Sequence, residues 1–171
     1  MDLTDILSLE EWIEFEKDIH EKSGLDVSVF DTEGIRITSS KKWVNRLCPV
    51  IKANDKGQAF ICAVAHMNIA AQAKNERKAV IEECDAGLIK LVVPILVNEE
   101  FVGSVGACGL LLGDGEVDSY MINRTTEIKE KEIESLLNEI ARITTEDAQS
   151  IAAYIQEQLD RIIEGFHQKR V

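Results

Sequence analysis

Two apolar segments in the middle of the chain restrict the fold more than any other feature. Residues 88–97 (LIKLVVPILV) form an almost continuous apolar run, and residues 101–112 (FVGSVGACGLLL) form a second one. The polar residues 98–100 separate them by the length of a tight turn. We therefore expect a long, buried hairpin. The glycines of its second strand leave that strand thinly covered, which allows close approach of a helix or a ligand.

The residues before this hairpin predict a helix followed by another strand pair. Ser8 and Glu11 form a capping-box signature, which predicts a helix that ends near Gly24. Residues 25–30 alternate between apolar and polar side chains, as in a half-buried strand. Residues 35–40 follow a turn sequence and predict the second strand of a hairpin.

A cysteine-containing helical region separates the two predicted hairpins. Cys48 followed by Pro49 is typical of a helix start, with the proline at the first helical position. The alanine-rich residues 58–75 contain no proline or glycine and predict a helix. Residues 78–84 predict a short strand.

The C-terminal third of the chain has a helical pattern. Residues 118–168 show no strand signal, and the apolar positions of residues 127–143 and 144–166 each gather on one helical side. Thr144 or Thr145 can cap the second of these helices. The whole pattern predicts an α+β fold with an antiparallel sheet. We expect a core of residues 1–116 and a C-terminal helical extension of the same domain over residues 117–171.

An excess of acidic side chains argues against nucleic acid as a direct partner. The 171 residues include 31 acidic and 19 basic side chains, for a net charge of −12, with no basic cluster to replace phosphate counterions. The N-terminus lacks the features of a secretory signal, and the longest apolar run is too short to cross a membrane. We expect a cytoplasmic protein without membrane contact, in which thiols stay reduced.

Three cysteines and a histidine are candidate metal ligands. Cys62 and His66 lie four residues apart on a predicted helix and therefore share one face. Cys48 lies at a predicted helix start, where the helix dipole is expected to lower the pKa of a thiol. Cys84 ends a predicted strand. Together these side chains are a permissible ligand set for zinc, iron, an Fe–S cluster or Cu(I), although their spacing matches no standard zinc finger.

Other roles remain open for the same residues. The cysteines could be small buried side chains, the usual fate of a free cysteine, and Cys108 is expected to pack in the core. Asp85 could be an ordinary turn residue. Cys84, His66 and Asp85 could form the thiol–imidazole–carboxylate set of a thiol enzyme. The sequence contains no recognisable substrate motif, so we expect no enzymatic activity.

The stretch from Leu47 to Gly109 resembles the PocR sensory domain family. The matching positions are Cys48, Cys62, the turn Cys84-Asp85-Ala86-Gly87-Leu88 and the strand residues Pro94-Ile95. Residues 9–34 and 143–155 resemble the flanks of the family's pattern. Two positions differ: Asp85 stands where the family often has histidine, and His66 stands where it often has an acid. If they face one pocket, the acid–imidazole pair is retained in reverse.

The resemblance implies a PAS-like small-molecule sensor that passes its ligand state to an output module. The implied ligand is a small alcohol, diol or carboxylate, in a bacterial or archaeal signalling system. The expected ligand-binding residues are Cys48, Cys62, His66, Cys84 and Asp85. A cysteine-ligated metal or redox sensor is the alternative. No output module follows residue 171, so the sensor is expected to signal through a partner protein or to come from a longer chain.

A homodimer is also expected. The apolar side of Trp12–Ile19 and the apolar sides of the C-terminal helices are the predicted contact surfaces, because they offer more aliphatic surface than a compact sheet domain leaves in water.

Overall fold

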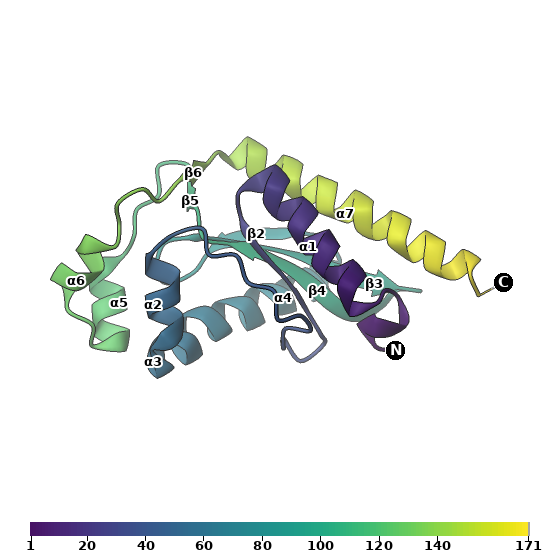
Figure 1. Ribbon diagram of the computed structural model, residues 1–171, viewed down its shortest axis with the longest axis horizontal. Helices are drawn as coiled ribbons and strands as arrows, with labels where there is room; N and C mark the ends of the chain where they lie inside the picture. Colours follow the sequence, from purple (N-terminus) through teal and green to yellow (C-terminus); the bar gives the residue numbers. More distant parts are fainter. Residues whose placement is uncertain (171) are drawn as a thin grey trace.

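A four-stranded antiparallel sheet forms the centre of this computed structural model, which describes residues 1–170 (Figure 1). The strand order is β1 (Asp26–Phe30), β4 (Glu100–Cys108), β3 (Ile89–Val97) and β2 (Val80–Glu83). Helices lie on both faces of the sheet, so the fold is α+β as the sequence predicts.

The central hairpin β3–β4 is confirmed. Val93 pairs with Val105 in an antiparallel register, and the register shifts between Ile95 and Leu96. The connecting residues Asn98 and Glu99 both have positive φ, 48° and 69°. Positive φ at both central residues is the requirement of the tight hairpin turn whose twist matches that of the strands.

The expected N-terminal hairpin is wrong. β1 pairs along its whole length with β4, from Asp26 opposite Cys108 to Phe30 opposite Ser104. The segment at 35–40 contributes only an isolated bridge between Phe30 and Arg36. All five residues of β1 are buried, which an exposed two-stranded hairpin could not provide. Tertiary burial therefore decides the partner of this strand.

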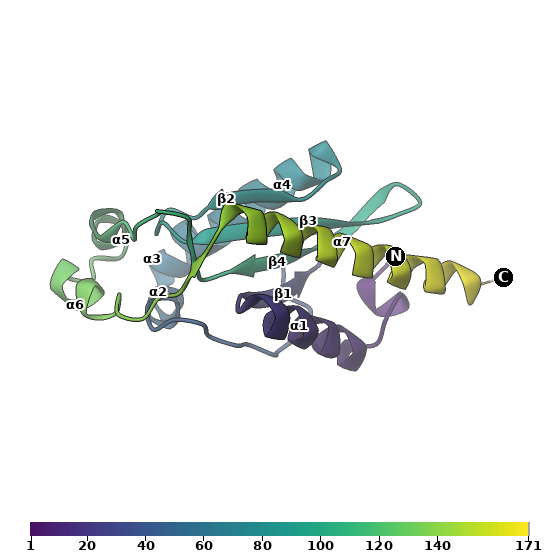
Figure 2. The same ribbon diagram turned by 90° about the horizontal axis from the view of Figure 1, so that it is seen from above.

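Two long helices cover one face of the sheet. α1 (Leu9–Ser23) and α7 (Thr145–Gln168) lie side by side there (Figures 1 and 2). The capping box of α1 is present, with Ser8 Oγ accepting from Glu11 N, and Gly24 ends the helix. The odd-numbered residues of β3 point into this layer and form the largest apolar core with the two helices.

This packing corrects the predicted dimer surface. Trp12 and Ile19 are fully buried within the chain, and Phe15 is buried against the same core. That side of α1 is therefore unavailable to a second copy. The apolar side of α7 is used in the same way, with Ile155 and Leu159 buried in this core. The homodimer itself stays a prediction, without the contact surfaces expected for it.

Shorter helices cover the opposite face. They are α2 (Leu47–Ala53), α3 (Asp55–Gly57), the π-helix η2 (Gln58–Ala63) and α4 (Val64–Glu76). The last two join without a break, which confirms the helix expected over residues 58–75. α4 packs on β3, where Ile69 and Ala73 meet Val92.

The C-terminal third is only partly as predicted. α5 (Ser119–Thr126) and α6 (Glu130–Ser135) precede a short strand, β6 (Arg142–Ile143), which pairs in parallel with β5 (Leu111–Leu112). The helix expected over residues 127–143 thus ends early, and a strand occurs where none was expected. The apolar residues after α6 pack against the cluster of α2 and α5.

The cap of α7 and the lengths of the helices also bear on the sequence predictions. Thr144 caps α7 by accepting from Asp147 N, as expected. Among the described residues, no helix is long and apolar enough to cross a membrane.

Removing one hydroxyl should weaken the α1–α7 contact. Tyr154 Oη donates to Asp18 Oδ2 at 2.5 Å, which links the two helices. We expect Tyr154→Phe to lower the free energy of unfolding by about 1 kcal/mol, because a hydrogen bond to a charged group is lost. Urea unfolding measures it. Tyr120→Phe, at an exposed side chain of α5, is the control. Equal stability of the two variants would contradict the prediction.

Candidate ligand-binding site

A cavity of about 400 Å³ lies between the sheet and the shorter helices. The strands, the helices and the loop before α2 all contribute to its wall. The wall includes Asp26, Phe30, Arg36, Lys41, Trp43, Cys48, Lys52, Gln58, Cys62, His66, Cys84, Lys90, Gly106 and Cys108. This volume is within the range of small-molecule sites in proteins.

The alternation of side chains along the strands explains which residues face the cavity. Even-numbered residues of β1 and β3 point away from the α1–α7 core, as do those of β4 from Ser104 on, after the register shift, and Lys90 lies opposite Cys108 in the register. Gly106 leaves space for the side chains of Phe30, Lys90 and His66, and an added Cβ atom would lie 3.0 Å from Lys90 Nζ. A Cβ atom at Gly106 would lie 2.9 Å from Phe30 Cε2 and 3.4 Å from His66 Nδ1.

The π-helix η2 provides the helical side of the cavity. Gln58, Cys62 and His66 follow one another at intervals of four residues, and all three line the wall. π-helical turns are rare and frequently occur at functional sites, because the wider turn redirects side chains. The same spacing predicted that Cys62 and His66 share a face.

The four candidate metal ligands lie around one cavity. Cys48 comes from α2, Cys62 from η2, His66 from α4, and Cys84 from the end of β2. Within residues 1–170, however, no three His, Cys, Asp or Glu side chains are grouped closely enough to hold a metal ion. A metal on these residues stays a prediction.

Asp85 does not join this set. Its side chain is exposed, and it does not line the cavity. Asp85 is the second residue of a tight turn in which Gly87 N donates to Cys84 O at 2.8 Å, so the chain turns back directly after Cys84. The acid–imidazole pair suggested by the resemblance is therefore not formed between Asp85 and His66.

His66 is buried without a hydrogen-bond partner. Its ring stacks on Phe30 with centroids 3.7 Å apart, and neither ring nitrogen has a partner within residues 1–170. Burial, together with the charges of Lys90 and Lys52, lowers the pKa of His66 to about 3. The ring is therefore neutral at physiological pH, with one N–H donor and one acceptor facing the cavity wall.

Other buried polar atoms of the cavity also lack partners. They are Asp26 Oδ1, Arg36 Nε and Gln58 Oε1. With the two nitrogens of His66, they make five of the six unpartnered buried side-chain atoms found in the described part of the chain. Buried polar groups are nearly always hydrogen-bonded in native proteins. Their concentration around one cavity indicates a site for a polar occupant.

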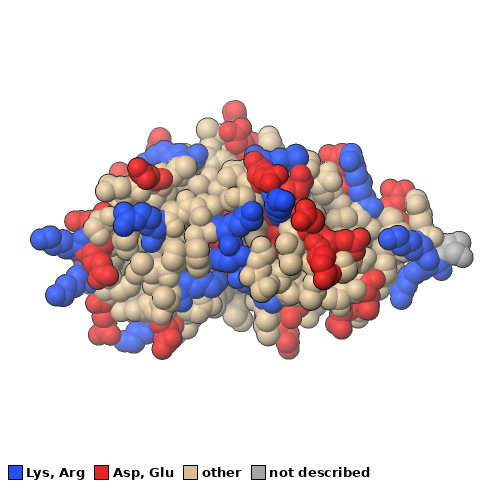
Figure 3. All heavy atoms as spheres, viewed as in Figure 1, with Lys and Arg blue, Asp and Glu red and all other residues tan. Residues whose placement is uncertain are grey.

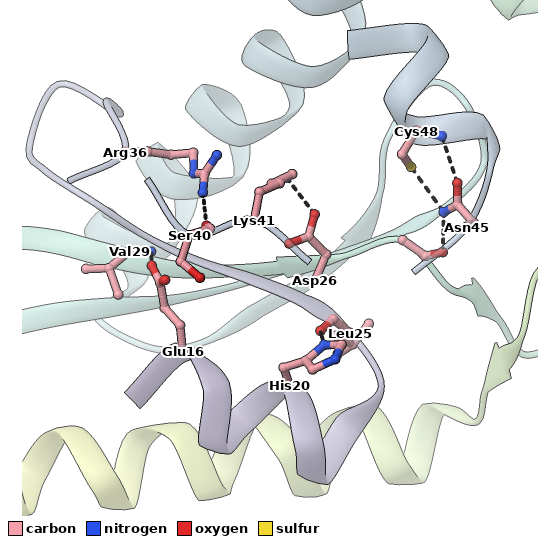
Figure 4. A network of polar contacts seen from close by, with 11 residues as sticks. Glu16, His20, Leu25, Asp26, Val29, Arg36, Ser40, Lys41, Asn45 and Cys48 are labelled. Carbon is pink, nitrogen blue, oxygen red and sulfur yellow. Dashed lines mark hydrogen bonds and ion pairs between the residues drawn. The ribbon is translucent and has the colours of Figure 1, made fainter. Parts of the chain in front are cut away.

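Basic side chains outnumber acidic ones in the cavity wall. Arg36, Lys41, Lys52 and Lys90 line it together with a single carboxylate, Asp26. Lys41 Nζ pairs with Asp26 at 2.5 Å, as Figure 4 shows beside the contact of Arg36 with the Ser40 carbonyl. Figure 3 shows basic side chains gathered near the middle of one face of the molecule.

Comparison with known proteins identifies the family. The family described as "Sensory domain found in PocR" matches residues 5–166. The chain belongs to the PocR sensory domain family. The comparison with curated proteins found no match.

Three thiols of this PocR domain, those of Cys48, Cys62 and Cys84, are protonated at neutral pH. Burial is the main cause that raises the pKa of Cys48 above its ordinary value, and burial likewise raises the pKa of Cys62 and of Cys84. The expectation that the helix dipole lowers the pKa of Cys48 is therefore wrong. α2 begins at Leu47, so Cys48 lies inside the first turn, where Asn45 Nδ2 donates to its sulfur at 3.2 Å (Figure 4).

Several wall residues of the PocR domain were missed in the sequence. Cys108 was expected in the core but lines the cavity as a fourth thiol. Its alternation with Gly106 along the strand could have indicated this face. Lys52 could not have been found in the same way, because its position depends on how α2 packs over the sheet.

Proposed function

We propose that this PocR sensory domain binds a small organic molecule in the cavity between the sheet and η2, and that occupancy of this cavity is the signal passed to an output partner. Membership of the family indicates a ligand-sensing domain. The observation that carries the proposal is the set of five unpartnered buried polar atoms around a cavity of about 400 Å³.

The chemistry of the wall supports binding rather than catalysis. The three half-buried thiols with raised pKa are protonated, so they are poor nucleophiles. Asp85, the carboxylate required by a thiol–imidazole–carboxylate set, is directed to solvent. Phe30 and Trp43 offer apolar ring surface to the organic part of a ligand. A few polar groups in a largely apolar wall are typical of small-molecule sites.

Ligand binding should depend on the space at Gly106. We expect members of a panel of short alcohols, diols and carboxylates to raise the melting temperature of the wild-type domain in a concentration-dependent way. Gly106→Val should abolish this rise, because its side chain would displace the Phe30 and His66 rings into the cavity. Differential scanning fluorimetry measures both proteins.

A second glycine supplies the control for this experiment. A Cβ atom at Gly165, in α7, would meet no atom within 4 Å, so Gly165→Ala should respond to ligand as the wild type does. If Gly106→Val kept every ligand response of the wild type, the cavity would not be the binding site. Circular dichroism establishes beforehand that both variants are folded.

A further inference from the structure

We propose that the cavity selects an organic anion, in particular a small carboxylate, and that Lys52 and Lys90 provide its counter-charges. This inference rests on the proposed function and adds the charge of the ligand to it. A cavity of this kind binds carboxylates in preference to neutral alcohols and diols of the same size.

Lys90 is a buried cation without a partner acid. Its side chain is 8% exposed, and its Nζ lies 5.2 Å from the centre of the Phe30 ring. No ion pair within residues 1–170 includes Lys90. Glu82 lies opposite Lys90 in the sheet, but its side chain is exposed. An uncompensated buried charge is unfavourable, so this site is incomplete without an anion.

Lys52 places a second unpaired cation in the same wall. It is half-buried in the last turn of α2 and forms no ion pair in the described chain. Burial lowers the pKa of Lys52, and the nearby charges of Lys41 and Arg36 lower it further. Repulsion among these cations does not stabilise the ligand-free domain. A bound anion reverses the sign of that interaction.

The donors of the wall fit the same ligand. Arg36 Nε is a buried donor without an acceptor, and the neutral His66 ring has one N–H to offer. A carboxylate accepts several such hydrogen bonds at once. The unpartnered acceptors Asp26 Oδ1 and Gln58 Oε1 suit a hydroxyl or amino group elsewhere on the ligand.

The positive charge of the cavity wall contrasts with the negative charge of the whole chain. A chain with a net charge of −12 repels small anions in general. The wall of the cavity holds four cations and one carboxylate, so its charge is opposite in sign to the net charge of the chain. The cavity is a local positive region inside an acidic protein, and it discriminates between ligands by charge.

Quenching of Trp43 fluorescence tests the proposal without knowledge of the natural ligand. The chain has two tryptophans: Trp12 is fully buried, whereas Trp43 lines the cavity and is 43% exposed. We expect the anion iodide to quench Trp43 more strongly than the cation caesium at equal ionic strength. The net negative charge of the chain would give the opposite order. Lys41 Nζ lies 4.5 Å from the centre of the Trp43 ring and itself attracts iodide, so the loss of this preference in variants of Lys52 and Lys90 is the deciding result. Stronger quenching by caesium would overturn the proposal.

Three lysine variants locate the anion. Lys52→Gln and Lys90→Gln should each reduce quenching by iodide and weaken binding of butyrate about tenfold or more, as expected for loss of a charge-assisted hydrogen bond. Lys56→Gln, which removes an exposed cation paired with Glu127, should leave both unchanged. Equal effects of all three variants would mean a general surface effect and would overturn the proposal. Because Lys52 has no partner, Lys52→Gln should not destabilise the ligand-free domain.

A matched ligand pair separates this proposal from the proposed function. Calorimetric titration compares butyrate with 1-butanol, which has a similar size and no charge. Binding of butyrate in preference to butanol is the expected result. Preference for butanol, lost in Gly106→Val, would overturn the anion proposal and leave the cavity as a ligand site. Binding of neither, with no iodide preference at Trp43, would count against both.

Discussion

Replacing Gly87 with alanine should lower the free energy of unfolding by about 3 kcal/mol. Gly87 has φ +88°, a conformation that costs about 1–2 kcal/mol for a residue with a side chain. An added Cβ would also lie 2.2 Å from the Glu116 carbonyl oxygen, so the segment after β5 must move. That movement would break the hydrogen bond from Asp118 N to Ala86 O, 2.9 Å long. Chemical denaturation measures the loss.

Gly113→Ala is the matched control for this substitution. Gly113 also has positive φ, +57°, but a Cβ there would meet no atom within 4 Å. Gly113→Ala should lower the free energy of unfolding by about 1 kcal/mol, the cost of the backbone strain alone. The difference between the two variants therefore isolates the contact of the turn with residues 116–118. If both variants lost the same stability, the turn at Gly87 would not anchor this segment.

Acid should destabilise the domain through His66. In the folded protein burial lowers the pKa of His66 from 6.5 to about 3. Between these values the unfolded chain binds a proton that the folded chain does not. The contribution of neutral His66 is therefore complete above the higher value and is lost as pH falls. Linkage gives a loss of about 3 kcal/mol between about pH 7.5 and about pH 4.

The variant His66→Gln isolates this contribution. Other groups titrate over the same interval, so the quantity to compare is the change in unfolding free energy with pH, measured by urea unfolding at each pH. The slope should be smaller in His66→Gln than in the wild type, whatever the stability of the variant at neutral pH. Buffers without carboxylate anions avoid occupation of the cavity. Identical slopes would show that His66 is not held neutral in the folded protein.

The geometry of the cavity also gives the cysteines a consistent role. Cys48, Cys62 and Cys108 come from three separate elements, Cys84 follows directly after β2, and all four line the same cavity. Thiols are small, polarisable groups that pack against apolar atoms and form only weak hydrogen bonds. Under the anion proposal, the polar recognition of the ligand falls to the lysines, Arg36 and the His66 ring.

The elements that the sequence predicted correctly depend on short-range signals. The capping box of α1, the Thr144 cap of α7 and the β3–β4 hairpin each depend on neighbouring residues that satisfy one another's backbone or turn geometry. The i, i+4 spacing of Cys62 and His66 was sufficient to place both on one face. The family pattern then brought Cys48 and Cys84 to the same site.

Other features were decided by contacts between distant segments. β1 pairs with β4 rather than with its neighbour in sequence, because that position buries all five of its residues. β6 has two residues and no strand signal, and it exists only because β5 lies beside it. Lys52 and Lys90 meet around one cavity although they come from a helix and a strand 38 positions apart in the sequence. The sequence alone determined the capped helices, the central hairpin and the shared face of Cys62 and His66. Only the tertiary structure decided the sheet partners, the exposure of Asp85 and the positive charge of the cavity, because burial and electrostatic fields depend on which distant side chains are brought together.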